Sequence, residues 1–254
     1  MTEYALQVLG VGNGADEAQG CAAMVVERAG EPLLLIDCGH GTLNRFRQRY
    51  GCWPRALYLT HCHLDHLADL EKLVIAAALG LCPQPRIYLH AALVERLLRI
   101  FDHFPAQMAE GGMNFGEALQ LVPVLTGFWC AGDLFQIHEV RHHLRQFCFA
   151  LHLPGVLFYS GDTRPIPELL AEVAGAPTLV VHDVSLLANP SHSGASELLA
   201  YPAELRQRLW LYHYARPEQA DELAALGLQP LRLGQRLLLP PADASHPARQ
   251  WAPQ

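Results

Sequence analysis

Clustered basic charge is missing from this sequence. Its 254 residues carry 18 Lys and Arg against 25 Asp and Glu, which gives a formal net charge of −7 and a pI near 6.0. A protein that neutralises a nucleic-acid backbone needs basic side chains gathered in one place. The charge balance therefore predicts that any contact with nucleic acid is local.

Targeting and membrane-spanning segments are missing as well. The first ten residues, MTEYALQVLG, contain no basic segment followed by a long apolar run, so we expect no secretory signal. No apolar stretch reaches the roughly 20 residues that a membrane-spanning helix needs. The seven cysteines are odd in number and form no C-x-x-C pair, which is typical of reduced thiols. We therefore expect a cytoplasmic protein that does not interact with a membrane.

The chain does contain short apolar stretches that alternate with helix-like segments, and this alternation predicts an α/β fold. No fixed-period repeat or low-complexity linker interrupts it. We expect one domain over residues 1–239 and a loosely ordered, Pro- and Ala-rich tail over 240–254. Residues 102–118 read as a long loop and are a candidate for a segment that covers the substrate.

Fourteen histidines are the compositional anomaly, and three of them occur in the motif THCHLDH at residues 60–66. His61 and His63 alternate on an extended segment, which would place both imidazoles on one side, facing one ion. Asp65 and His66 come a turn later, near the start of a predicted helix that continues to about residue 77, and could serve a second ion. This spacing of metal-ligand residues predicts a metal site.

Two metal ions need more ligands than this motif holds, and later strand ends supply them. His142 and His143 follow a predicted strand, Asp162 follows an apolar strand and a glycine, and His213 ends another strand. A carboxylate such as that of Asp162 can bridge two cations. The sequence therefore predicts a two-ion site assembled from distant segments.

The motif THCHLDH, the later His142, Asp162 and His213 follow one another in the order found in the metallo-β-lactamase-fold hydrolases. The chain resembles this family from about residue 4 to about residue 239. The resemblance implies an αββα sandwich, in which two mixed β-sheets face each other, helices cover the outer faces and the metals lie at one edge. It also implies that Asp37 supports the site from behind the ligands. The implied ligands are His61, His63 and His142 for the first metal, Asp65, His66 and His213 for the second, and Asp162 as the bridge.

Two details of the metal site stay open. The family spacings V-x-H after Val140 and H-x6-[FY] to Phe149 favour His142 as the ligand, and His143 is the alternative. The imidazole-rich ligand set favours two zinc ions, while manganese and iron also suit the carboxylates. His63 stands where the flavodiiron branch of the fold has Glu, which favours hydrolysis over redox chemistry.

Several segments resemble the ribonuclease Z and small phosphodiesterase branch of the family. They are VLGVGNG, LLLIDCGHGT, HHLRQFCF, and VVHDVSLL followed by PSHSG. This resemblance implies that His192, oriented by Asp183, donates a proton to the leaving alkoxide, while Asp65 helps to orient the nucleophile. However, the basic loop of the tRNA-processing members is replaced by the acidic stretch ADEAQGC, and their long basic insertion is not visible. tRNA is therefore not the expected substrate.

The sequence thus predicts a dinuclear metal-dependent phosphodiesterase that acts on a small-molecule substrate such as a cyclic nucleotide or a cyclic phosphate. A lactone or thioester hydrolase on the same metals is one alternative. A metal-binding sensor or pseudo-enzyme is another, although the complete ligand set counts against it. Apolar helix faces are compatible with a homodimer.

Overall fold

Two β-sheets form the centre of the protein in the computed structural model, which describes residues 3–16, 18–101, 115–143 and 146–241. In spatial order, the seven-stranded sheet contains β13 (Arg236–Leu238), β1 (Tyr4–Gly10), β2 (Ala23–Arg28), β3 (Glu31–Ile36), β4 (Ala56–Leu59), β5 (Arg86–His90) and β6 (Gln120–Val124). The six-stranded sheet contains β12 (Leu209–Tyr212), β11 (Leu179–Asp183), β10 (Leu157–Tyr159), β9 (Gln146–Leu153), β8 (Asp133–His143) and β7 (Gly127–Cys130).

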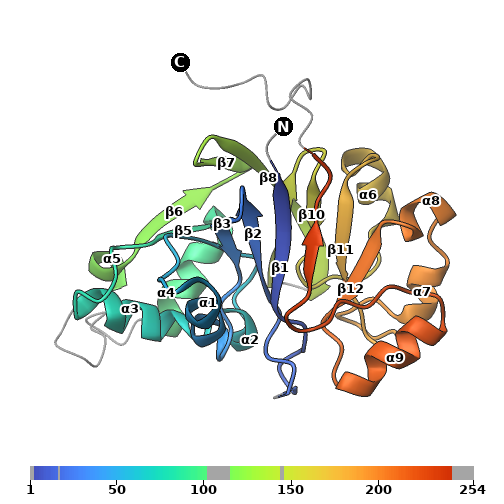
Figure 1. The fold of residues 1–254 in the computed structure, drawn as a ribbon, viewed down its shortest axis with the longest axis horizontal. Helices are drawn as coiled ribbons and strands as arrows, with labels where there is room; N and C mark the ends of the chain where they lie inside the picture. The colour runs from blue at the N-terminus through green and yellow to red at the C-terminus, as the bar shows by residue number, and fades with distance from the viewer. Residues whose placement is uncertain (1–2, 17, 102–114, 144–145, 242–254) are drawn as a thin grey trace.

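Helices cover both outer faces of this pair of sheets (Figure 1). On the side of the first sheet lie α1 (Thr42–Tyr50), α2 (Leu64–Leu67), α3 (Leu70–Ala78), the short 3-10 helix η1 (Ala91–Leu93), α4 (Val94–Phe101) and α5 (Phe115–Ala118). On the other side lie α6 (Pro167–Val173), α7 (Ala195–Leu199), α8 (Ala203–Arg206) and α9 (Pro217–Ala225). This four-layer arrangement confirms the predicted αββα sandwich.

The alternation of side chains along the strands explains why both faces of the first sheet are buried. In β2, Met24 and Val26 belong to the core cluster that also contains Phe135 and Phe158 of the second sheet. Val25 points the other way and belongs to the cluster under the helices. Because successive side chains of a strand point to opposite faces, a continuous apolar run such as AMVV can be buried on both sides.

Both sheets place polar residues at the carboxyl ends of their parallel strands. Strands β3 to β6 are parallel, and so are β10 to β12. His61 comes two residues after the end of β4, Asp162 follows β10, Asp183 ends β11 and His213 follows β12. The strand ends therefore bring residues that are far apart in sequence to one edge of the sandwich.

Two local expectations were wrong. His142 and His143 lie inside β8, because the pairing with β9 continues past a register shift between Val140 and His143. The helix expected after the histidine motif is divided into α2 and α3. At the division, the backbone N–H of Asp69 donates to the carbonyl of Cys38 over 2.9 Å instead of to a carbonyl of the preceding turn.

Some expectations fall on residues that are not described. Residues 102–114 of the expected loop lie outside the described residues, and its remaining residues form α5. The tail expected over 240–254 also lies outside them, apart from its first two residues. In the part of the chain that is described, no helix is both long enough and apolar enough to cross a membrane.

Candidate metal centre

Three imidazoles and one carboxylate form the first of two side-chain clusters. His61 Nε2 lies 3.0 Å from His63 Nδ1, and His142 Nε2 lies 3.2 Å from the same atom. The Oδ2 atom of Asp162 is 3.7 Å from His61 Nε2 and 3.9 Å from His142 Nε2. His61, His142 and Asp162 are buried, whereas His63 is half-buried at the opening. Nitrogen atoms from two sheets thus converge with one carboxylate oxygen.

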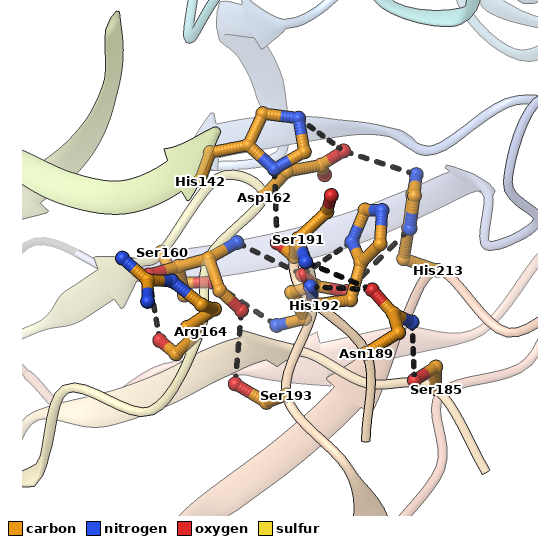
Figure 2. Close-up of polar contacts among 12 residues, drawn as sticks. His142, Ser160, Asp162, Arg164, Ser185, Asn189, Ser191, His192, Ser193 and His213 are labelled. Carbon is orange, nitrogen blue, oxygen red and sulfur yellow. Dashed lines mark hydrogen bonds and ion pairs between the residues drawn. The ribbon is translucent and has the colours of Figure 1, made fainter. Parts of the chain in front are cut away.

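The second cluster lies on the other side of Asp162. Asp65 and His66 come from the first turn of α2, and His213 comes from the end of β12. Asp65 Oδ2 lies 3.6 Å from His66 Nε2 and 3.5 Å from His213 Nε2. Asp162 Oδ2 is 3.4 Å and 3.3 Å from the same two nitrogens. Figure 2 shows Asp162 between His142 on one side and His213 on the other.

Buried polar atoms in these clusters have no hydrogen-bond partner among the described residues. These atoms are His66 Nε2, His213 Nε2 and Asp162 Oδ1. A buried polar atom without a partner costs about 1–3 kcal/mol, so their common direction points to a ligand that would satisfy them. The donor atoms within each cluster lie within 4.8 Å of one another. Imidazole and carboxylate donors at this spacing fit a centre for two divalent metal ions.

A second layer of contacts fixes the orientation of the imidazoles. The Oδ2 atom of Asp37 lies 2.8 Å from His66 Nδ1, and the backbone N–H of Thr60 donates to Asp37 Oδ1 over 2.9 Å. The hydroxyl of Thr60 is also 2.9 Å from His61 Nδ1. The structure therefore gives Asp37 the supporting position that the sequence implied, and it adds Thr60, which looks like an ordinary strand residue in the sequence.

Strained backbone occurs at two residues of this centre. Asp37 has a φ of 59° and His213 a φ of 76°, in the left-handed region that non-glycine residues rarely adopt. Such a conformation costs of the order of 1–3 kcal/mol and persists where surrounding contacts enforce it. The N–H of His213 donates to the carbonyl of Val11 over 2.6 Å, and that of Asp37 donates to Tyr58 over 2.9 Å. The fold therefore holds both side chains in place at a local cost.

Burial and the carboxylates act in opposite directions on the histidine pKa values. Burial lowers the pKa of His61 well below its usual value, and it lowers that of His142 to about 4. Burial would also lower the pKa of His213, but the Asp162 charge and a hydrogen bond with Asp183 outweigh it and raise the pKa to about 10. The shifts of His61 and His142 favour the neutral imidazole, the form that binds metals, while the second cluster attracts positive charge.

His192 and Asp183 lie beside the two clusters. His192 Nδ1 is 2.8 Å from Asp183 Oδ2, which also accepts a hydrogen bond from the N–H of Thr163 over 2.8 Å. The other oxygen of Asp183 is 3.5 Å from His213 Nδ1. The His192 ring is 4.8 Å from the His213 ring, and its side chain keeps 21% of its surface exposed. His192 therefore borders the centre beside His213 (Figure 2), and a ring nitrogen of His192 lies within 4.8 Å of donor atoms of Asp162, Asp183 and His213.

The structure distinguishes His142 from His143. His142 Nδ1 donates to the carbonyl of Ser191 over 3.0 Å, which leaves Nε2 facing the first cluster. His143 is exposed, and its Nδ1 lies 3.0 Å from the hydroxyl of Ser191. The ligand groups found among the described residues include His142 and not His143. Ser191 contributes a backbone oxygen, which its residue type does not reveal in the sequence.

A family model described as "Anti-Pycsar protein Apyc1" matches residues 4–232. The chain belongs to the Apyc1 family. It is 26% identical to the Apyc1 protein of Paenibacillus sp. (strain J14), over 83% of this chain and 89% of that one. It is also 26% identical to the mouse "Zinc phosphodiesterase ELAC protein 2", over 70% of this chain. The matched part spans only about a quarter of the mouse protein, 24% of its length.

Solved structures agree with this membership at the level of the fold. The metallo-β-lactamase-fold protein YhfI from Bacillus subtilis superposes with a TM-score of 0.72 at 16% identity. The superposition covers 93% of this chain and 99% of YhfI. A diphosphatase from the PhnP family also gives 0.72, at 19% identity, with 92% and 97% covered. These matches confirm the metallo-β-lactamase fold. With the family model and the ligand clusters, they identify a metal-dependent hydrolase of a phosphodiesterase family.

Proposed function

We propose that this Apyc1-family chain hydrolyses the phosphodiester bond of a small cyclic nucleotide with two zinc ions as cofactors. The position of Asp162 supports this most directly, because one buried carboxylate lies within 4 Å of nitrogens from both clusters. Zinc is favoured because imidazoles dominate the donor set and because relatives are named zinc phosphodiesterases. His61, His63 and His142 would hold one ion, Asp65, His66 and His213 the other, and Asp162 both.

The bound ions would activate a water molecule and stabilise the negative charge that grows on the phosphoryl oxygens. Asp65 is suited to orienting the attacking water, because its side chain is 18% exposed while Oδ2 faces the second cluster. The buried Asp37 carboxylate fixes the ring of His66 from the opposite side. Asp65 would therefore hold the attacking water in position, and Asp37 would hold the ligand His66.

His192 would donate a proton to the leaving oxygen. Its Nδ1 faces the carboxylate of Asp183, which leaves Nε2 as the atom that can exchange a proton with the substrate. The ring centroid lies 5.1 Å from that of His142 and 4.8 Å from that of His213, so the donor borders both clusters. Asp183 would act through His192, by fixing its tautomer and orientation.

The charge of the chain favours a small substrate over a folded RNA. The net charge is −7, and the loop that is basic in tRNA-processing relatives contains the acidic Asp16. Its carboxylate is occupied within that loop, since it accepts hydrogen bonds from the side chain of Gln19 over 2.5 Å and from the N–H of Ala18 over 2.8 Å. The stretch ADEAQGC therefore offers a phosphate backbone no basic side chain of its own.

A substrate panel tests this function. Zinc-loaded protein would be incubated with 3′,5′-cyclic nucleotides, an aryl phosphodiester, a lactone, a thioester and a precursor tRNA, and a parallel series would contain manganese. We expect cyclic nucleotides to be opened to linear monophosphates, and Asp162→Ala to abolish this turnover. Turnover of the lactone or thioester without any turnover of cyclic nucleotides would contradict the proposal, as would a wild-type protein that binds zinc and hydrolyses nothing.

A further inference from the structure

A cavity lies at the edge of the first sheet opposite the metal centre. Its volume is about 700 Å³. Ala56, Arg86 and Gln120, the first residues of β4, β5 and β6, contribute to its wall. The parallel strands run from this edge toward the other, where His61 follows β4. At about 3.3 Å per residue, the backbone of His61 lies roughly 17 Å from that of Ala56, so a small ligand here would not reach the metals.

Arginine side chains of neighbouring strands are brought together in this cavity. The N–H of Arg86 donates to the carbonyl of Arg55 over 3.0 Å, so the two residues occupy adjacent backbone positions, and both line the cavity. The Nε atom of Arg86 donates to Gln120 Oε1 over 3.2 Å. Across residues 3–241, as far as they are described, neither guanidinium forms an ion pair. Both side chains are exposed, and because like charges on neighbouring strands repel each other, an anion bound between them would relieve the repulsion.

A third guanidinium approaches from the opposite wall. Arg28 Nη1 forms an ion pair with Asp133 Oδ2 over 2.9 Å, which holds the side chain in the cavity wall. Burial raises the pKa of the Cys130 thiol to about 11, and the charges of Arg28 and Arg86 both oppose this shift. The guanidiniums of Arg28 and Arg86 therefore both stabilise the thiolate form of Cys130, although the two arginines belong to different strands. Glu31 is the only carboxylate among the described residues that line the cavity, so cationic side chains outnumber anionic ones there.

We propose that this cavity binds a small phosphate-bearing molecule, separately from the metal centre. Guanidinium groups match the geometry of phosphate oxygens and can bind them through paired hydrogen bonds. The volume lies in the range of about 300–1,000 Å³ that is typical of small-molecule sites. Arg55 and Arg86 bind the phosphate, and Gln120 and Glu31 contact polar groups of the attached organic part. Arg28, whose charge is paired with Asp133, forms part of the wall.

Arginine footprinting with inorganic phosphate as the probe tests this site directly. Zinc-loaded protein would be treated with phenylglyoxal with and without phosphate, and the modified arginines would be identified by mass spectrometry. At a phosphate concentration about ten times its dissociation constant, Arg55 and Arg86 should react about tenfold more slowly. The exposed residues Arg99 and Arg206 should react at unchanged rates. Equal rates at Arg55 and Arg86 with and without phosphate would overturn the proposal.

A double variant separates this cavity from phosphate that binds at the metals. Equilibrium dialysis with labelled phosphate should find two sites in the wild type and in the control Arg99→Gln/Arg206→Gln, which loses the same charge. In Arg55→Gln/Arg86→Gln, one site should weaken by about a hundredfold or more, because two charge-assisted hydrogen bonds to the phosphate are lost. Hydrolysis of an aryl phosphodiester and the melting temperature should stay unchanged. Two unweakened sites in the double variant would contradict the proposal, whatever the substrate of the metal centre proves to be.

Discussion

Replacing His192 with alanine tests the proposed proton donor. The substitution removes the ring whose Nδ1 lies 2.8 Å from Asp183 and leaves the seven proposed ligands in place. Because a ring nitrogen of His192 also lies within 4.8 Å of donor atoms of Asp162, Asp183 and His213, the metal content of the variant has to be measured. An alkoxide is a poor leaving group and needs a proton as its bond to phosphorus breaks, whereas an aryl oxide leaves without one. We therefore expect His192→Ala to impair cyclic nucleotides far more than aryl phosphodiesters.

The expected size follows from the general-acid role. Losing a positioned proton donor costs about 10²–10⁴-fold in rate, which corresponds to about 2.7–5.4 kcal/mol of transition-state stabilisation. For an aryl phosphodiester the loss should stay below about tenfold, because little proton transfer accompanies departure of the leaving group. The assay compares kcat for both substrates in zinc-loaded protein whose metal content has been measured.

His143→Ala is the matched control for this experiment. His143 contacts the same residue, Ser191, but is exposed and lies outside the ligand clusters. The His143→Ala variant should therefore keep kcat for both substrates near the wild-type values. Equal losses on both substrates in His192→Ala, at unchanged metal content, would refute the role of His192 as the proton donor.

Three further predictions concern the metal site and its support. Asp37→Asn should weaken zinc binding about 10–100-fold in a chelator competition, because the anion behind His66 is lost; unchanged affinity would show that the contact is dispensable. Gly161→Ala should lower the free energy of unfolding by about 1–3 kcal/mol in urea denaturation, because the φ of Gly161 is 62° and an added Cβ would lie 2.8 Å from the sulfur of Cys148. An unchanged free energy of unfolding would refute this. In metal-free protein, the folded-state pKa of His213 is about 10, so its stabilising contribution is present below pH 6.5 and lost as the pH rises through 10. The pKa of His142 is about 4, so its contribution is present above pH 6.5 and lost as the pH falls toward 4. The melting temperature should therefore peak near pH 6.5, and a steady rise to pH 10 would contradict this.

The layers of the fold and the local part of the centre could be predicted from the sequence. The spacing of four ligands is short enough to recognise in the sequence: His61, His63, Asp65 and His66. Their relative positions depend only on the end of β4 and the first turn of α2. The choice of His142 depended on family spacing alone. The irregular register of β8 decides which ring faces the clusters, and residue type does not encode such an irregularity.

The supporting contacts were harder to foresee. Ser191 acts through its carbonyl oxygen and Thr60 through a buried hydroxyl directly after β4, so neither carries a distinctive signal. The approach of Asp183 to His213 joins two strands that are 30 residues apart, which only the assembled sheet reveals. The domain extent of 1–239, the cytoplasmic location and the homodimer stay predictions.

Elemental analysis of the zinc-incubated protein tests the two-ion centre most directly. After unbound metal is removed, the wild type should hold about two equivalents of metal, and so should Asp221→Ala, whose side chain is exposed and lies outside the ligand clusters. Asp162→Ala should lose much of both, because its carboxylate lies between the clusters. A wild-type protein that holds no metal or one ion, or an Asp162→Ala variant that keeps two, would contradict a centre bridged by Asp162.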